Sequence, residues 1–203
     1  ICPFDAYKMD AEAVVADARE ALNALTDALN GYKTKYNDEI SKAKAEWDAI
    51  VDDYYTKELD GGLNQTLALG IINEFMGDED IALGSAGSLP GDMQRLFRPK
   101  GRGTYHMEYG FSNMGYEVNG ALGAKLAKPE AEVYTFCGDG SFLMGHSELY
   151  TAVQEGVKIN VCLFDNLGWG CIENLQNNQG TDTFGTVFRA RNPKTGMLDG
   201  AEI

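Results

Sequence analysis

The chain has 203 residues, of which 44% are hydrophobic and 24 are Gly, and its formal net charge is −14. The hydrophobic and aromatic content excludes a disordered chain, and the lack of a Gly-x-y period excludes collagen. An acidic surface without a Lys/Arg cluster argues against nucleic acid and membrane surfaces as partners. The sequence contains no run of 18 apolar residues, so no transmembrane helix is predicted. Every Gly except Gly31 lies beyond residue 60, so we expect the two parts of the chain to be built differently.

Residues 1–60 are predicted to be a helical segment, which the family resemblance given below implies to be the tail of a middle domain and a linker. Apolar residues at helical spacing predict one helix over residues 10–30, capped by Asp10, and a second over residues 38–59. The packing side of the second helix is expected to consist of Ile40, Ala43, Trp47, Ile50 and Tyr54. Gly61-Gly62 then marks a boundary.

From residue 61 to residue 203, helical and strand-like segments alternate. Helices are predicted over residues 63–76, 114–127 and 146–155, strands over 80–84, 132–137 and 158–165, an irregular stretch over 85–93, and a polar loop from Gln176 onward. In the first of these helices, Leu67, Ile71 and Phe75 recur at helical spacing. Strands that are apolar on both faces and alternate with helices indicate an α/β fold with a three-layer, doubly wound, mostly parallel sheet.

The four cysteines, Cys2, Cys137, Cys162 and Cys171, show neither a CxxC motif nor the spacing of a metal site. Cys137 and Cys162 lie in apolar runs, which favours buried free thiols over a disulfide. We therefore expect a cytoplasmic protein, because that compartment keeps thiols reduced. The chain starts without Met and without a signal-peptide pattern, so we expect a piece of a longer protein.

Two polar loops follow neighbouring predicted strands, Gly138-Asp139-Gly140-Ser141 and Asp165-Asn166-Leu167-Gly168. One helix and one strand separate them, so a right-handed parallel crossover would place both at the carboxyl edge of the sheet, where open α/β folds bind ligands. The Asp139 carboxylate, the Asn166 amide oxygen and the Gly168 carbonyl suit Mg²⁺ and leave room for two oxygens of a diphosphate. The neighbours expected to contact that diphosphate are Gly138, Gly140 and Ser141.

GDGS follows a strand, and 25 residues separate Gly140 from Asn166 at the end of the next strand. This spacing resembles the signature of thiamine diphosphate enzymes. The resemblance extends from about residue 61 to the end, and residues 112–129 resemble the helix upstream of that signature in relatives of acetolactate synthase. It implies thiamine diphosphate and Mg²⁺ as cofactors, with Met114 beneath the thiazolium ring. Gly87 and Ser88, in a Gly/Ser-rich stretch after a strand, are expected to contact the cofactor as well.

Longer stretches are similar to one family within this superfamily, the trihydroxycyclohexane-1,2-dione hydrolases of myo-inositol catabolism. They are residues 106–127, 138–166, 168–176 and 184–189. This resemblance implies hydrolysis of a carbon–carbon bond in a cyclic polyhydroxy 1,2-diketone, giving 5-deoxy-glucuronate. The alternative is a carboligase or decarboxylase like acetolactate synthase or pyruvate oxidase. A non-catalytic nucleotide-binding module is disfavoured because the GxGxxG and P-loop spacings are missing.

The resemblance also implies parts that lie outside this chain. Thiamine diphosphate enzymes activate their cofactor with a Glu on a separate domain, for which these residues show no counterpart, so the chain alone is expected to be inactive. Their active sites form between subunits, which implies a homodimer or tetramer. The chain ends in LDGAEI, where a further strand and helix are expected, so the domain over residues 61–203 is predicted to be truncated. His106 is the candidate acid or base within the chain, and Glu108 and His146 are weaker candidates.

Overall fold

The structure, a computed structural model, describes residues 3–60, 63–201 and 203. The chain divides into two compact units, Ile1–Asp48 and Ala49–Ile203, and each is described by itself. The predicted boundary between residues 1–60 and 61–203 stays a prediction, and Gly61-Gly62 lies outside the described residues. No helix in the described part of the chain is both long and apolar enough to cross a bilayer.

Helix α1 (Ala18–Ala28) of the first unit is shorter than predicted. It begins after Asp17, whose carboxylate accepts the backbone N–H groups of Arg19 at 2.9 Å and Glu20 at 3.3 Å. The predicted cap, Asp10, instead lies in a turn with a φ of 50°. The helix starts at Asp17 because this residue satisfies N–H groups of the first turn. The predicted apolar residues Val14, Leu22, Leu25 and Leu29 are exposed in the described structure.

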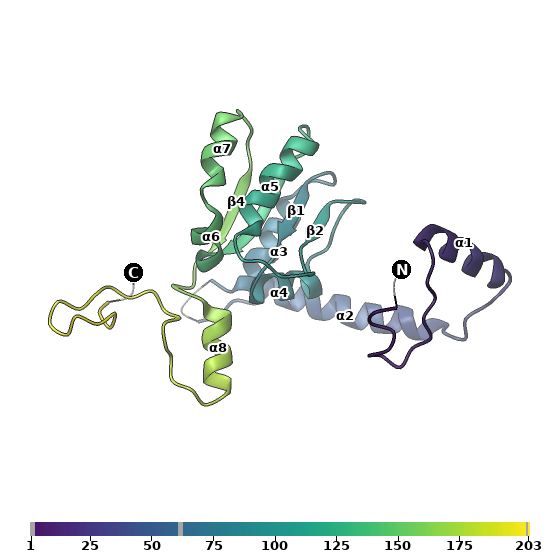
Figure 1. Cartoon of the computed structure of the whole chain (residues 1–203), viewed down its shortest axis with the longest axis horizontal. Helices are drawn as coiled ribbons and strands as arrows, with labels where there is room; N and C mark the ends of the chain where they lie inside the picture. Colours follow the sequence, from purple (N-terminus) through teal and green to yellow (C-terminus); the bar gives the residue numbers. More distant parts are fainter. Residues whose placement is uncertain (1–2, 61–62, 202) are drawn as a thin grey trace. The chain divides into compact units, whose positions relative to one another are not determined.

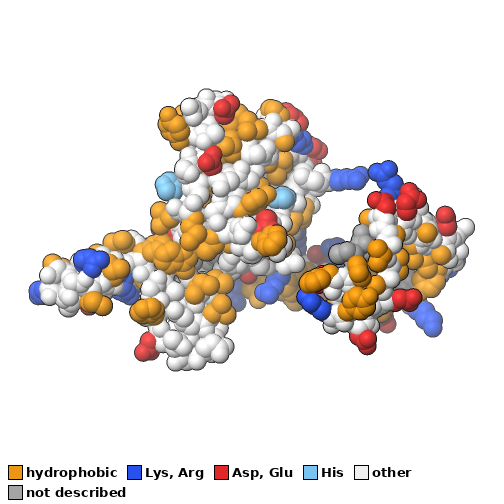
Figure 2. Space-filling model, viewed as in Figure 1, with side chains coloured by type: hydrophobic (Ala, Val, Ile, Leu, Met, Phe, Trp, Pro, Cys, Tyr) orange, Lys and Arg blue, Asp and Glu red, His pale blue; other side chains and the backbone are white. Residues whose placement is uncertain are grey.

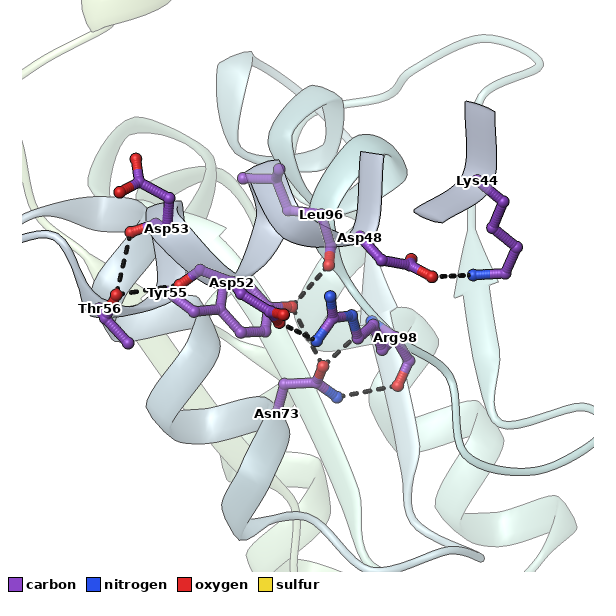
Figure 3. A network of polar contacts seen from close by, with 9 residues as sticks. All are labelled: Lys44, Asp48, Asp52, Asp53, Tyr55, Thr56, Asn73, Leu96 and Arg98. Carbon is purple, nitrogen blue, oxygen red and sulfur yellow. Dashed lines mark hydrogen bonds and ion pairs between the residues drawn. The ribbon is translucent and has the colours of Figure 1, made fainter. Parts of the chain in front are cut away.

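Helix α2 (Asp38–Thr56) has nearly the predicted bounds but buries a different side. Val51 and Tyr55, in the part of α2 that belongs to the second unit, are buried and cluster with Leu96 of the same unit. The Tyr55 hydroxyl lies 2.6 Å from the Leu96 carbonyl oxygen and 3.1 Å from Oδ1 of Asn73 (Figure 3). The predicted packing residues Ile40, Ala43, Trp47, Ile50 and Tyr54 are exposed. The prediction was wrong because burial here is confined to the last turns of the helix.

Within residues 63–201, four parallel strands form one sheet in the order β2-β1-β3-β4 (Figure 1). The strands are β1 (Ile81–Gly84), β2 (Tyr105–Met107), β3 (Val133–Gly138) and β4 (Asn160–Phe164). The parallel sheet and the adjacency of β3 and β4 confirm the predicted α/β fold. Strand β2 was not predicted, because three residues are too few to show a strand pattern.

Helices cover both faces of this sheet. On one face, α3 (Gln65–Phe75) and α4 (Ser88–Leu96) pack on β1 and β3 in a cluster that contains Leu69, Met93 and Phe136. On the other face, α5 (Tyr116–Ala127) packs on the same strands in a cluster of Ile81, Ala121, Ala131 and Val133. The three predicted layers are therefore present. The remaining helices are α6 (Asp139–Gly145), α7 (Glu148–Gln154) and α8 (Gly170–Asn178).

Several local predictions in this unit were wrong. Most of the stretch expected to be irregular is α4, which tolerates Pro90 because the N–H groups of a first turn need no intrahelical partner. Helices α6 and α8 were not predicted; both start in polar, Gly-rich sequence that is also typical of loops. Helix α3 buries Leu69 and Asn73 rather than Ile71 and Phe75, which are exposed.

Candidate functional site

A cavity of about 350 Å³ lies where β1, β3 and β4 end. Its walls come from the start of α4, the turn before α5, the start of α6 and the loop between β4 and α8. The nine residues predicted to bind the cofactor or the metal all line it: Gly87, Ser88, Met114, Gly138, Asp139, Gly140, Ser141, Asn166 and Gly168. Segments far apart in the sequence thus meet at one place, although the role of each residue stays a prediction.

Asp139 joins two of these walls. Its Oδ1 accepts the N–H of Gly140 at 2.9 Å, and its Oδ2 accepts the N–H of Gly168 at 2.7 Å. Asp139 is only 7% exposed. Burial raises the pKa of this carboxyl above its usual value, the two N–H donors lower it, and the nearby Asp165 carboxyl raises it again. A buried carboxylate beside a second acidic group is a favourable place for a cation.

The β4–α8 loop offers two further oxygens in a specific backbone shape. The side chain of Asp165 accepts the N–H of Leu167 at 2.9 Å, and Leu167 has a φ of 62°, which turns the chain sharply. A Cβ at Gly168 would collide with the carbonyl oxygen of Thr186, so only Gly fits there. Within the described residues, the Asn166 amide has no hydrogen-bond partner. The carboxylate of Asp139, the amide of Asn166 and the carbonyl of Gly168 would together give an all-oxygen donor set, which fits Mg²⁺.

A segment that the sequence did not assign to the site holds this loop from outside. The backbone N–H of Trp169 donates to the Thr186 carbonyl oxygen, and the backbone N–H of Phe188 donates to the Leu167 carbonyl oxygen, both at 2.8 Å. The Trp169 and Phe188 rings lie edge to face with centroids 4.7 Å apart. Trp169 also covers Gly140, where a Cβ would approach its ring to 2.7 Å. The sequence signal for this bracing is the stretch FGTVFR at residues 184–189, which by itself indicates only the family resemblance.

Ser141 lines the cavity, but its hydroxyl is engaged inside the protein. It donates to Oε2 of Glu117 at 2.6 Å and accepts the N–H of Gly115 at 2.7 Å. The hydroxyl proton is therefore not free for a phosphate in this arrangement. Glu117 was missed by sequence reasoning because its only signal is an acidic residue in the first turn of a small-residue helix.

The start of α4 presents a different surface to the cavity. Gly87 precedes the helix with a φ of 90°, and Gly87, Ser88 and Leu89 all line the cavity. Because Gly has no side chain to cap the helix, the first N–H groups remain available to a ligand. A helix start of this kind favours phosphate oxygens.

The candidate acid–base residues lie elsewhere. His106 on β2 is exposed, its Nε2 lies 2.8 Å from the Tyr116 hydroxyl, and it is not among the residues that line the cavity. Nδ1 of His146 lies 3.2 Å from the Leu143 carbonyl oxygen. Figure 2 shows the two His side chains of the chain as separate pale-blue groups on the surface. Glu108 accepts the N–H groups of Phe111 and Asn113, which lower the pKa of its carboxyl, so it holds its own loop.

Residues 85–202 match a family described as thiamine pyrophosphate enzyme, C-terminal TPP binding domain. The chain belongs to this family. The match covers the cavity walls from the start of α4 to the segment that braces the β4–α8 loop. The predicted resemblance to thiamine diphosphate enzymes is thereby confirmed.

Two curated relatives of this TPP-binding chain are named 3D-(3,5/4)-trihydroxycyclohexane-1,2-dione hydrolase. The chain is 47% identical to the protein of Clostridium tetani (strain Massachusetts / E88) and 48% identical to that of Geobacillus thermodenitrificans (strain NG80-2), in each case over 98% of its own length. It spans only 35% of the length of each relative.

A solved structure is similar as well, the Rhodococcus jostii RHA1 thiamine diphosphate-dependent 4-hydroxybenzoylformate decarboxylase. The TM-score is 0.59 with 20% sequence identity, over 64% of this chain and 25% of that chain. At this level of identity the likeness supports the fold alone.

Proposed function

We propose that this chain is the diphosphate- and magnesium-binding part of a thiamine-diphosphate-dependent hydrolase that cleaves a carbon–carbon bond in a trihydroxycyclohexane-1,2-dione. The observation that carries the proposal is the meeting of the Asp139 loop and the Asn166–Gly168 loop at one cavity. The names of the curated relatives support a trihydroxycyclohexane-1,2-dione as the substrate. The product that we propose, 5-deoxy-glucuronate, follows from the family resemblance alone.

Each wall of the cavity has its own part in this proposal. Asp139, Asn166 and the Gly168 carbonyl would hold Mg²⁺, and the start of α4 at Gly87 and Ser88 would bind phosphate oxygens. Met114 would support the ring of the cofactor from below. Thiamine diphosphate would supply there a nucleophilic carbon and an electron sink for the broken carbon–carbon bond. The activating Glu would come from a part of the protein outside this chain, and His106 remains a candidate that the cavity geometry does not support.

The proposal includes the setting of the whole enzyme. We expect a homodimer or tetramer, because active sites of the resembling enzymes form between subunits. We expect it in the cytoplasm, where thiols such as those of Cys137, Cys162 and Cys171 stay reduced.

The test is Mg²⁺-dependent binding of thiamine diphosphate to the full-length protein, measured by calorimetry with and without Asp139→Asn. The substitution removes the only charged oxygen of the donor set, so we expect the affinity to fall at least a hundredfold, about 2.7 kcal/mol. Glu155→Gln, which neutralises an exposed carboxylate at the end of α7, is the matched control and should bind normally. Unchanged affinity of Asp139→Asn would contradict the proposed site.

The substrate requires a separate measurement. The full-length protein should release a ring-opened acid from the cyclic dione and should not consume pyruvate. Turnover of pyruvate without turnover of the dione would favour the alternative, an enzyme like acetolactate synthase or pyruvate oxidase.

A further inference from the structure

Glu117 is a buried carboxylate with no part in the site as proposed so far. It lies in the first turn of α5 and is only 1% exposed. An ionised group is costly to bury unless hydrogen bonds compensate for the lost water. Glu117 must therefore be held by strong local donors.

Three neutral donors hold this carboxylate, and each comes from a different segment. The N–H of Ala86 donates to Oε1 at 3.1 Å, the N–H of Gly115 donates to Oε2 at 3.1 Å, and the hydroxyl of Ser141 donates to Oε2 at 2.6 Å. Ala86 and Ser141 line the cavity, and Gly115 follows Met114, which also lines it. The carboxylate thus links the β1–α4 loop, the turn before α5 and the start of α6.

The docking of α5 on the sheet rests on other groups. Val118 and Ala121 of α5 are fully buried, and the Thr135 hydroxyl donates to the Glu117 backbone carbonyl at 2.9 Å. These contacts hold the helix without the Glu117 side chain. The contacts of the carboxylate all go to segments that form the cavity or directly adjoin it.

We propose that Glu117 is a positioning residue that holds the three segments in the arrangement that binds thiamine diphosphate. This inference rests on the proposed function, because it gives the Glu117 carboxylate a role in the same site. The three donors occupy both side-chain oxygens, one on Oε1 and two on Oε2. A Gln would replace one oxygen with an NH₂ group, so at least one of the three donors would face another donor instead of a carboxylate oxygen.

The experiment compares Glu117→Gln with Thr135→Val in the full-length protein. Thr135→Val removes a buried hydrogen bond to the backbone of the same residue but leaves the carboxylate and its three donors in place. We expect Glu117→Gln to weaken Mg²⁺-dependent thiamine diphosphate binding at least tenfold in calorimetry. We expect Thr135→Val to lower the melting temperature while changing this affinity less than twofold.

Amide hydrogen exchange, followed by mass spectrometry without cofactor, gives a second readout. Glu117→Gln should speed exchange in peptides that contain Ala86 or Gly115, because the group that accepts both N–H groups loses one oxygen. The change at Gly115 should be the smaller one, since its N–H also donates to the Ser141 hydroxyl oxygen at 2.7 Å. Thr135→Val should leave exchange in those peptides unchanged. Unaltered exchange and unaltered affinity in Glu117→Gln, or an equal loss of affinity in Thr135→Val, would overturn the role of Glu117.

Two further outcomes remain decisive. If Glu117→Gln does not fold, Glu117→Asp keeps the charge but shortens the reach, and wild-type affinity in that variant overturns the inference. If the unsubstituted protein binds no thiamine diphosphate, the proposed function fails. The exchange measurement then still decides whether Glu117 holds the three segments.

Discussion

At the scale of single residues, the Asp139 carboxylate accepts one backbone N–H on each oxygen, from Gly140 and from Gly168. Each carboxylate oxygen has a second lone pair, so the same group can join two loops and still ligate a cation. Ser141 shows the opposite case, because Glu117 and Gly115 already engage its hydroxyl. A motif such as GDGS places residues at a site, but their hydrogen bonds decide what each can offer a ligand.

The free thiols provide a prediction at this scale. Burial raises the pKa of Cys137 to about 12, whereas Cys171 is half-buried and lines the cavity. At pH 8 only about one Cys137 thiol in ten thousand is then ionised, and the thiolate is the reactive form. We expect iodoacetamide at pH 8 to label Cys171 well before Cys137, as measured by peptide mass spectrometry. Cys2 lies outside the described residues, and the labelling of its peptide does not enter this comparison.

The same labelling tests the cavity. Mg²⁺ with thiamine diphosphate should slow the labelling of Cys171, since the cofactor would occupy the cavity that this residue lines. Cys162, whose pKa burial raises to about 11, is the internal control and should stay poorly reactive in both states. Equal labelling of Cys171 with and without bound cofactor would contradict the placement of the cofactor in this cavity.

At the scale of elements, the last turns of α2 are attached to α3 and α4 through polar as well as apolar contacts (Figure 3). Tyr55 bonds to the Leu96 carbonyl, and Asn73 exchanges two hydrogen bonds with the backbone of Arg98 at 3.0 Å each. A Cβ at Gly70 would meet the Tyr55 ring at 2.6 Å, so this Gly allows the two helices to approach closely. A hydrophobic stripe in the sequence contains none of this information, which is why the buried side of α2 was predicted wrongly.

Tyr55→Phe should therefore destabilise the protein without affecting the cavity. It deletes a hydroxyl that lies 2.6 Å from the Leu96 carbonyl and leaves that carbonyl without this donor, at a cost of about 1–2 kcal/mol. Urea unfolding measures the effect. Tyr54→Phe, at the neighbouring exposed position of α2, is the control and should change the stability by less than about 0.5 kcal/mol. Equal effects of the two substitutions would show that the Tyr55 hydroxyl does not attach α2.

At the scale of the whole molecule, the sequence predicted the three-layer parallel sheet and nine of the residues that line the cavity, whose roles stay predictions. Both depend on regular patterns: apolar strands that alternate with helices, and polar residues at the ends of adjacent strands. The carboxylate of Glu117 and the bracing of Gly168 by Thr186 could not be predicted. Both depend on groups that meet only in the folded chain. Glu117 lies 24 residues before Ser141 in the sequence, and Thr186 lies 18 residues after Gly168.

The exposure of the connection between α1 and α2 can be tested by limited trypsin digestion. Lys33 and Lys35 are exposed in the non-helical connection between α1 and α2, whereas Tyr55 bonds the end of α2 to the Leu96 carbonyl within the second unit. Because a protease needs locally unfolded backbone, we expect the first cuts after Lys33 or Lys35, leaving α2 joined to the sheet. Replacing both lysines with Gln should slow this cleavage. A first cut after Lys57 would instead place the boundary near residue 60, as the sequence predicted, and would mean that the Tyr55 contacts do not hold α2 in place.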